Sequence, residues 1–194
     1  MSYRTHIKPI LDFLMVVILL IPAIGLGLII VLAYVLTFQF PICFKQFRLG
    51  IKGRPFKMYK FRTLSADFTK SVQMRKFRLG NILRASNLDE LPQLWNVLKG
   101  EMSLIGPRPL PVEYLPLFSE EQKKRFEVKP GITGWAQVNG RHSVPWKQKL
   151  ELDNYYVDHV SLMLDIRIVI KTLVLFLSFK KDRSLEEEKF TGSH

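Results

Sequence analysis

An acidic pair, Asp89 and Glu90, lies at the start of a predicted helix. Ser86 and Asn87 are residue types that cap helices, and Pro92 is tolerated only near a helix start because it lacks an N–H group. The positive end of the helix dipole favours ionised carboxylates there, which suits a nucleophile or a magnesium ligand. Acidic residues in a first turn are also common capping features, so the pair alone leaves both interpretations open.

An arginine held between two prolines, Arg108, is a candidate phosphate ligand. Its planar guanidinium can bind two phosphate oxygens at once, and the rigid backbone between Pro107 and Pro109 loses little entropy on binding. A tight surface turn with a solvated arginine would have the same sequence. Lys60 and Arg62 would share one face of a strand and offer a second basic site, although a solvated strand edge fits equally well.

Short apolar runs and turn residues predict the elements that position these groups. Ile42–Leu49 and Pro55–Thr63, separated by a turn at Gly50–Arg54, predict a β-hairpin. The glycines and proline of Pro130–Trp135 predict a loop. Helices are expected elsewhere in this part of the chain. They are Lys70–Leu83, Leu88–Lys99 ending at Gly100, Ser119–Lys129 with the capping signature Ser119-Glu120-Glu121-Gln122, and Trp146–His159.

An uncharged apolar segment, Phe13–Leu36, is long enough to cross a bilayer as a helix. Pro22 near its middle predicts a bend, because proline removes one helical hydrogen bond. Basic residues flank the segment on both sides, whereas a simple span has its excess of lysine and arginine on one side. Two interpretations remain open: a kinked transmembrane helix, or a re-entrant helix, break and helix that leaves on the face it entered. The basic flanks are Arg4, Lys8, Lys45, Arg48, Lys52 and Arg54.

A second apolar segment, Ile166–Phe179, carries Arg167 and Lys171 one helical turn apart. This pattern is typical of a helix that lies in the membrane interface. An ordinary core helix is the alternative interpretation.

The formal net charge of +12 indicates anionic partners, such as phosphates, nucleic acid or acidic lipid headgroups. The single cysteine, Cys43, excludes an internal disulfide and a cysteine-cluster metal site. The four histidines are scattered, and the sequence has no Walker loop and no Gly-x-Gly-x-x-Gly motif. A zinc site, a histidine triad and these nucleotide-binding loops are therefore not expected.

Four motifs follow one another along the chain: Lys60–Thr63, Leu88–Gly100, Gly106–Pro109 and Lys129–Gly140. Their order, with Asp12 near the start of the apolar segment, resembles that of the bacterial sugar transferases, also called monotopic phosphoglycosyl transferases. The resemblance covers nearly the whole chain. The compact length is similar to that of small members that begin glycoprotein glycan assembly, such as the diacetylbacillosamine phosphate transferases.

The resemblance implies an enzyme that transfers a sugar 1-phosphate from a UDP-sugar to a polyprenyl phosphate carrier such as undecaprenyl phosphate. Asp89 would attack the β-phosphate, release UMP and hold the phosphosugar until the carrier accepts it. Glu90 would assist metal binding or proton handling, and Mg²⁺ bound by Asp89 and Glu90 would offset the diphosphate charge. Substrate binding is assigned to Lys60, Arg62, Arg84, Pro107, Arg108 and Pro109.

By the same resemblance the fold is α+β and mostly helical, with a re-entrant membrane helix, a β-hairpin and a compact helical catalytic domain with interfacial helices. The expected division is an anchor over residues 1–40, a catalytic domain over 41–180 and a polar tail over 181–194. The expected location is the cytoplasmic face of a bacterial inner membrane. The expected partners are the UDP-sugar, polyprenyl phosphate, the phospholipid bilayer and downstream glycosyltransferases, with no nucleic acid.

The sequence departs from this family in two places. Ile21 precedes Pro22 where small members often carry serine, and Ser65–Lys76 is less acidic than in comparable relatives. Two other functions fit part of the pattern. A membrane-surface adaptor would bind acidic lipid through its basic face without catalysis. A membrane phosphatase would use Asp89 as the nucleophile but pass the phosphoryl group to water.

Overall fold

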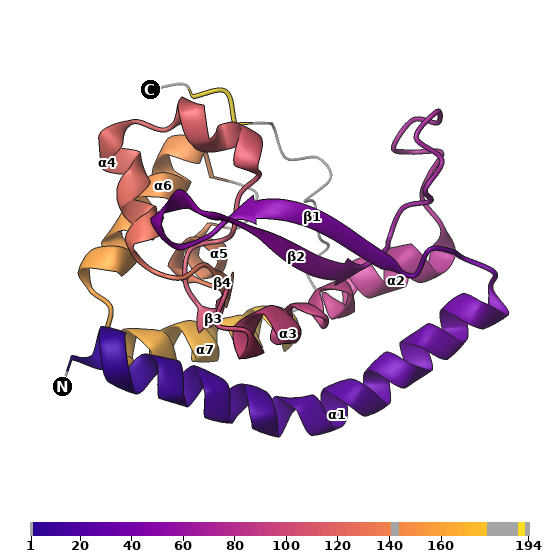
Figure 1. The fold of residues 1–194 in the computed structure, drawn as a ribbon, viewed down its shortest axis with the longest axis horizontal. Helices are drawn as coiled ribbons and strands as arrows, with labels where there is room; N and C mark the ends of the chain where they lie inside the picture. The colour runs from indigo at the N-terminus through magenta and orange to yellow at the C-terminus, as the bar shows by residue number, and fades with distance from the viewer. Residues whose placement is uncertain (1, 141–143, 178–189, 193–194) are drawn as a thin grey trace.

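A long amino-terminal helix runs along one side of the molecule, and the rest of the chain packs against its concave face (Figure 1). The computed structural model describes residues 2–140, 144–177 and 190–192. Helix α1 spans Lys8–Leu36 and follows a π-helical turn at Tyr3–Ile7. It is continuous through Pro22, and Figure 1 shows it curved along its length. The break expected at Pro22 is therefore only a bend, because the helix tolerates the loss of the one hydrogen bond that Pro22 cannot donate.

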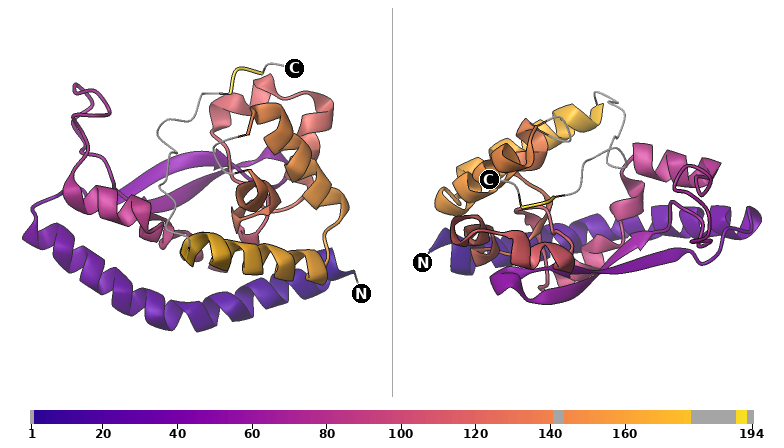
Figure 2. Two further views of the ribbon diagram at one scale, coloured as in Figure 1. Left: turned by 180° about the vertical axis from the view of Figure 1, so that it is seen from behind. Right: turned by 90° about the horizontal axis from the view of Figure 1, so that it is seen from above.

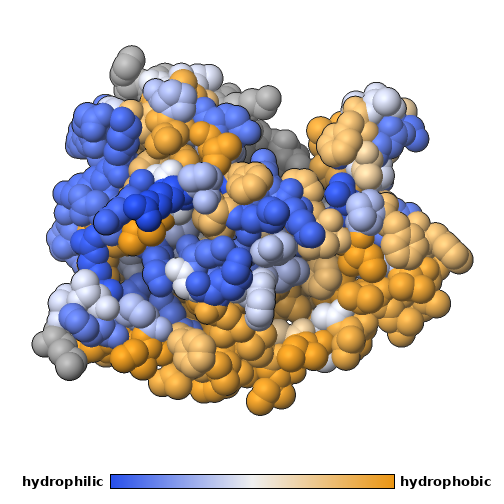
Figure 3. Space-filling model, in the orientation of Figure 1, coloured by the Kyte–Doolittle hydropathy of each residue, from blue (hydrophilic) through white to orange (hydrophobic). Residues whose placement is uncertain are grey.

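Most of α1 exposes apolar side chains. Only Lys8, Val16, Ile30 and Tyr34 are buried along the helix. Figure 3 shows the exposed apolar residues as a continuous band along the α1 side of the molecule. Among the described residues this is the one helix long and apolar enough to cross a membrane.

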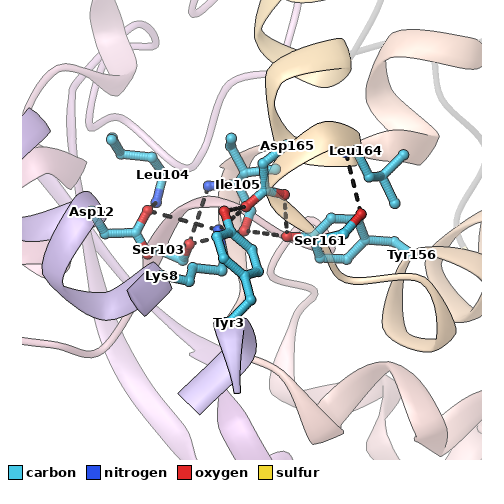
Figure 4. A network of polar contacts seen from close by, with 10 residues as sticks. All are labelled: Tyr3, Lys8, Asp12, Ser103, Leu104, Ile105, Tyr156, Ser161, Leu164 and Asp165. Atoms are coloured by element: carbon cyan, nitrogen blue, oxygen red, sulfur yellow. Dashed lines mark hydrogen bonds and ion pairs between the residues drawn. The ribbon is translucent and has the colours of Figure 1, made fainter. Parts of the chain in front are cut away.

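Buried polar contacts fasten the amino-terminal end of α1 to the rest of the chain (Figure 4). Lys8 Nζ lies 2.8 Å from Asp165 Oδ2 on helix α7, Leu162–Leu177. Ser103 Oγ donates a hydrogen bond of 2.7 Å to Asp12 Oδ2. Because these groups are largely shielded from water, removing one partner would leave a buried charge.

The carboxyl-terminal end of α1 is fastened to the same body. Tyr34 is fully buried, and its hydroxyl donates to the carbonyl oxygen of Arg62. Its ring stacks on Phe61, with the centroids 6.1 Å apart. Both ends of α1 therefore contact the domain that carries the acidic pair.

The predicted hairpin is confirmed. Strands β1, Cys43–Leu49, and β2, Pro55–Phe61, pair antiparallel and are joined by a 3₁₀ turn at Ile51–Gly53. Gly53 adopts a φ of 68°, which glycine accommodates without strain. Met58 and Phe56 point from β2 into the core, while Lys57 between them is exposed.

The predicted helix Lys70–Leu83 is wrong in its first half. Helix α2 spans only Arg78–Ala85. The preceding segment folds back on itself through a bridge between Leu64 and Lys76 and a hydrogen bond of 2.9 Å from Ser65 N to Arg75 O. These contacts use backbone groups that a helix would have paired internally.

The acidic pair lies in a short 3₁₀ turn, Leu88–Glu90, followed after Pro92 by helix α3, Gln93–Leu98. This agrees with the predicted helix Leu88–Lys99, with Pro92 near its start. The expected cap is wrong, because Asn87 adopts a φ of 55° and its side chain accepts no capping hydrogen bond. Gly100, with a φ of 73°, follows the end of α3 as predicted.

The predicted loop Pro130–Trp135 contains a strand. Strand β4, Gly131–Thr133, pairs in parallel with β3, Ser103–Ile105. Three-residue strands are too short to show a periodic pattern, so the sequence does not reveal this pairing. The pairing fixes the backbone just before Arg108.

The remaining helices surround these strands (Figures 1 and 2). The capping box that begins α4 and the helix predicted at Trp146–His159 are both confirmed. Helix α7 buries only Leu164, Asp165 and Ile168, so an ordinary core helix is excluded for its described part. The remaining elements are a 3₁₀ segment at Val112–Leu117, α4 at Glu120–Lys123, a 3₁₀ turn at Lys124–Glu127, α5 at Trp135–Asn139 and α6 at Trp146–Asp158.

The architecture is α+β and mostly helical, as predicted. Most of the tail predicted over residues 181–194 lies outside the described residues. Phe190 within it is buried against Tyr114 and Phe118 and packs in the core.

Candidate active site

A cavity of about 1020 Å³ lies between the hairpin, the acidic pair and the two apolar helices. Its polar wall includes most of the predicted site residues. Its apolar wall comes from the concave side of α1 and from the end of α7. The predicted residues that line it are Lys60, Arg62, Arg84, Asp89, Glu90 and Arg108, and the apolar residues include Leu19, Pro22, Ala23, Leu26, Leu175 and Phe176.

Glu90 is held by two cations. Its Oε1 lies 2.5 Å from Lys60 Nζ on β2 and 3.3 Å from Arg108 Nη2. Burial alone would raise the pKa of Glu90, but the charges and hydrogen bonds of Lys60 and Arg108 lower it to about 2. Glu90 is therefore ionised at neutral pH and joins the hairpin to the loop that follows β3.

Asp89 has a different environment from its neighbour. It is 7% exposed, and no cation lies within salt-bridge distance of it in the described parts of the chain. Burial raises the pKa of Asp89, and the more distant charges of Lys60, Arg84 and Arg108 oppose this effect. A partly desolvated carboxylate without a tight counter-ion is available to react with an electrophile.

Arg108 is held through its backbone. Arg125 Nη2 donates a hydrogen bond of 2.7 Å to the carbonyl oxygen of Arg108, and also lies 2.8 Å from Asp153 Oδ2. Pro107 and Pro109 do not line the cavity. Their carbonyl oxygens accept hydrogen bonds from Gly131 N and Arg48 Nη1, which hold the loop on both sides of Arg108.

Arg62 and Arg84 line the cavity on the side of α2. Arg84 donates to Thr63 Oγ1, and the guanidinium of Arg62 lies 5.6 Å from the Phe44 ring centroid. The charge of Arg84 lowers the pKa of Asp89 and so opposes the effect of burial. The predicted basic residues are thus brought together with the acidic pair in one cavity.

Sequence reasoning missed part of the polar wall. Arg125 and Asp153 are each 3% exposed and come from distant positions, the 3₁₀ turn after α4 and helix α6. Lys149 lies one helical turn before Asp153 and faces the same cavity. The i, i+4 spacing of Lys149 and Asp153 was the available sequence signal, but it is also common on solvated helices.

The protein residues could hold Mg²⁺ only if the phosphates of a substrate supplied further ligands. No group of three or more histidine, cysteine, aspartate or glutamate side chains that could hold a metal occurs in the described ranges. Asp89 and Glu90 offer hard carboxylate oxygens, and Lys60 and Arg108 both contact Oε1 of Glu90, not Oε2. Mg²⁺ typically takes one or two protein carboxylates together with substrate phosphates, so the residues are compatible with it.

Comparisons with known proteins agree on one family. The family model described as bacterial sugar transferase matches residues 3–179. An uncharacterized sugar transferase, EpsL, of Bacillus subtilis is 45% identical over 161 residues, covering 79% of this chain and 80% of that protein. A UDP-glucose:undecaprenyl-phosphate glucose-1-phosphate transferase of Xanthomonas campestris is 38% identical over 195 residues, covering 92% of this chain and 40% of the relative.

The name of a third relative gives a different sugar. A UDP-N-acetylgalactosamine-undecaprenyl-phosphate N-acetylgalactosaminephosphotransferase of Aeromonas hydrophila is 41% identical over 151 residues, covering 71% of this chain and 36% of the relative. The chain thus spans less than half the length of the Xanthomonas and Aeromonas proteins.

Proposed function

This chain belongs to the bacterial sugar transferase family, and we propose that it transfers a sugar 1-phosphate from a UDP-sugar to polyprenyl phosphate. The products are a polyprenyl diphosphate-sugar and UMP. The names of the relatives support this reaction class, with undecaprenyl phosphate as the acceptor. The reaction is the first membrane step of glycan or polysaccharide assembly, and its product is a substrate for downstream glycosyltransferases.

One observation carries the proposal: a single cavity joins the acidic pair and its basic surroundings to the apolar faces of α1 and α7. A water-soluble nucleotide sugar and a lipid-linked phosphate must meet at one carboxylate. A cavity with a cationic wall and an apolar wall suits both reactants, since phosphates bind arginine and lysine while an isoprenoid avoids water.

Asp89 is the proposed nucleophile. A carboxylate oxygen of Asp89 forms a bond to the β-phosphorus of the UDP-sugar, and the bond from that phosphorus to the UMP oxygen breaks. UMP leaves with the electron pair. An oxygen of polyprenyl phosphate then attacks the same phosphorus, and the carboxylate of Asp89 is released. Burial strips water from this carboxylate, which favours attack, while Lys60, Arg84 and Arg108 help to keep it ionised.

Glu90 is the proposed organiser of the site. Its ion pairs hold Lys60 and Arg108 beside Asp89, where the diphosphate must lie. When bound at Asp89 and Glu90, Mg²⁺ would neutralise charge on the diphosphate oxygens. Arg108 presents a planar fork to the same phosphates, and its backbone is fixed by Arg125.

A re-entrant placement of α1 at the cytoplasmic face of the inner membrane is part of the proposal. The amino-terminal end is tied to Asp165 by Lys8, and the carboxyl-terminal end is tied to the hairpin by Tyr34. A helix whose two ends contact one water-soluble body returns to the face from which it entered. The exposed apolar band of α1 (Figure 3) and the exposed apolar side chains of α7 would lie in that leaflet.

The test is a panel of UDP-sugars supplied with polyprenyl phosphate and magnesium, with UMP as the readout. The proposal predicts UMP release with at least one sugar and the appearance of a polyprenyl diphosphate-sugar. Asp89→Asn is the inactive control. An adaptor would release no UMP from any sugar, and a phosphatase would release inorganic phosphate without the lipid acceptor.

A further inference from the structure

The cavity has two chemically different ends on either side of the acidic pair. Helices α6 and α2 lie at opposite ends of the hairpin (Figures 1 and 2). The chain of contacts from Asp153 through Arg125 to the backbone of Arg108 leads to the α6 end. From Lys60, strand β2 leads to Arg62, at the α2 end.

The α2 end carries arginines against aromatic rings. The guanidinium of Arg75 lies 4.4 Å from the centroid of Phe68, and that of Arg62 lies 5.6 Å from the centroid of Phe44. Cations together with flat rings suit a nucleoside monophosphate, which combines an anion with a planar base.

The α6 end combines acidic, basic and amide groups with an indole ring. Asp153 Oδ1 and Gln137 Oε1 are buried acceptors without a hydrogen-bond partner among the residues that the structure describes, although both side chains line the cavity. Lys149 Nζ lies 4.8 Å from the centroid of Trp146, and both line the same end. Unpaired buried acceptors are uncommon in proteins and indicate a missing partner.

A sugar ring has the chemistry of that missing partner. Its hydroxyls donate and accept hydrogen bonds, as those of the ribose of UMP also do, whereas a pyrimidine base and a phosphate offer mainly acceptors. The charge of Asp153 is already balanced by Arg125, which lies 2.8 Å away, so this acid does not repel a neutral or diphosphate-linked ligand as an isolated carboxylate would.

We propose that Gln137, Trp146, Lys149 and Asp153 form the subsite for the sugar ring of the donor and select which UDP-sugar is used. The proposal rests on the function inferred above. It assigns the uridine monophosphate portion to the α2 end, beside Arg62 and Arg75. The acidic pair and Arg108 lie between the two ends, where the reacting phosphorus must be.

Two mild substitutions test the subsite. Gln137→Met and Lys149→Met keep side-chain length but remove the hydrogen-bonding groups, and both leave the Arg125–Asp153 pair in place. The matched controls are Gln148→Met and Lys147→Met, because these two residues are exposed on the same helix as Lys149 and do not line the cavity. Retention of each variant in the membrane and an unchanged midpoint of thermal unfolding would exclude misfolding.

The readouts separate the sugar from the nucleotide. Single-turnover UMP release is measured with UDP-sugars that differ at one hydroxyl or by an acetamido group, and the inhibition constant of UMP is measured in parallel. Loss of one hydrogen bond to a sugar hydroxyl should lower kcat/KM for the preferred donor by about tenfold and change the ranking of the sugars. The inhibition constant of UMP should stay unchanged.

Two results would overturn the subsite. One is an equal loss for every UDP-sugar with a raised inhibition constant for UMP, which would place the nucleotide at the α6 end. The other is a set of rates and rankings that match those of the Lys147→Met and Gln148→Met controls. Failure of the proposed function is a separate result, because the unmodified protein would then release UMP from no donor.

Discussion

Lys60 Nζ lies 2.5 Å from Glu90 Oε1, so an ion pair joins the β-hairpin to the turn that carries the acidic pair. Both side chains are 16% exposed, which makes this contact less screened than a surface salt bridge. The same lysine also acts at longer range on Asp89, where its charge opposes the effect of burial. The charge of Lys60 therefore lowers the pKa of both carboxyl groups, of Glu90 by direct contact and of Asp89 from a greater distance.

Lys60→Met should shift the pH dependence of the reaction. Without this charge the pKa of Asp89 rises further and that of Glu90 rises from about 2. Because Asp89 must be ionised to attack, the acid limb of the profile of kcat/KM against pH should move to higher pH. Loss of the charge-assisted hydrogen bond should also lower kcat/KM by about 10- to 100-fold.

Lys57→Met is the matched control for this lysine. Lys57 lies on the same strand, is exposed and does not line the cavity. Its substitution should leave both the rate of UMP release and its pH profile unchanged. An acid limb that stays in place in Lys60→Met would contradict the electrostatic role given to Lys60.

Gly106→Ala should impair the enzyme by displacing the loop that carries Arg108. A Cβ atom at this position would lie 2.4 Å from Lys129 O and 3.0 Å from Gly131 N, both backbone atoms of the neighbouring segment. The parallel pair of β3 and β4 must then separate, so kcat/KM should fall by at least about tenfold.

Gly25→Ala is the control for the glycine substitution. A Cβ atom there has nothing within 4 Å, and the residue lies within α1. Activity should be retained, and helix propensity alone would favour alanine by up to about 1 kcal/mol. Circular dichroism and UMP release of the two variants in detergent would separate a local clash from a general intolerance of alanine.

Arg125→Leu and Asp153→Leu should each destabilise the protein more than the double variant does. The two side chains are 2% and 5% exposed and lie 2.8 Å apart, so either single change leaves a buried charge. The cost of a broken buried pair is about 3–5 kcal/mol, whereas replacement of both partners is often nearly neutral. Thermal unfolding of the solubilised protein would measure the three variants.

In the three variants of Arg125 and Asp153, the rate of UMP release should not follow thermal stability. Arg125 also donates to the carbonyl of Arg108, and leucine cannot replace that hydrogen bond. The double variant should therefore recover much of the stability but little of the UMP release. Full recovery of activity would show that Arg108 does not depend on Arg125 for its position.

Local sequence signals predicted the hairpin, the capping box at Ser119 and the helix after Pro145, because each depends on residues close together in the chain. The acidic pair was also placed correctly at a helix start. Its cap was not, since Asn87 takes a left-handed conformation and its side chain makes no capping hydrogen bond.

Long-range pairings could not be predicted from the residues alone. Lys8 and Asp165 are 157 residues apart, and nothing near either residue indicates its partner. The same is true of Arg125 with Asp153 and of β3 with β4. The start of α2 was misplaced for a related reason, because tertiary backbone contacts of Ser65 and Arg75 overrode the helix propensity of the intervening residues.

The placement of α1 makes a topological prediction. Single cysteines introduced at Ser2 and Lys52, in a Cys43→Ser background, should both react with an impermeant thiol reagent from the cytoplasmic side only. The background change is needed because Cys43 is itself exposed. Labelling of the Ser2 position from the periplasm would show a full span and would require the contact between Lys8 and Asp165 to be broken in the membrane.

The covalent step gives the last prediction. If Asp89 is the nucleophile, protein incubated with UDP-sugar and magnesium but without polyprenyl phosphate should release at most about one UMP per active site and hold a phosphosugar adduct. Addition of the acceptor should discharge the adduct. Asp89→Asn should release no UMP, because the amide has the shape of the carboxylate but lacks its charge.

Intact-protein mass spectrometry after a rapid quench, followed by peptide mapping, would locate the added mass. Glu90→Gln is the informative comparison, because it removes the charge that pairs with Lys60 and Arg108 but leaves Asp89 in place. Its adduct should form slowly and still map to Asp89. If UMP appears only when both substrates are present, and the peptide containing Asp89 never carries the added mass, the acceptor attacks the donor directly. Asp89 would then serve to bind the metal or the phosphate, and its buried carboxylate would not be the nucleophile.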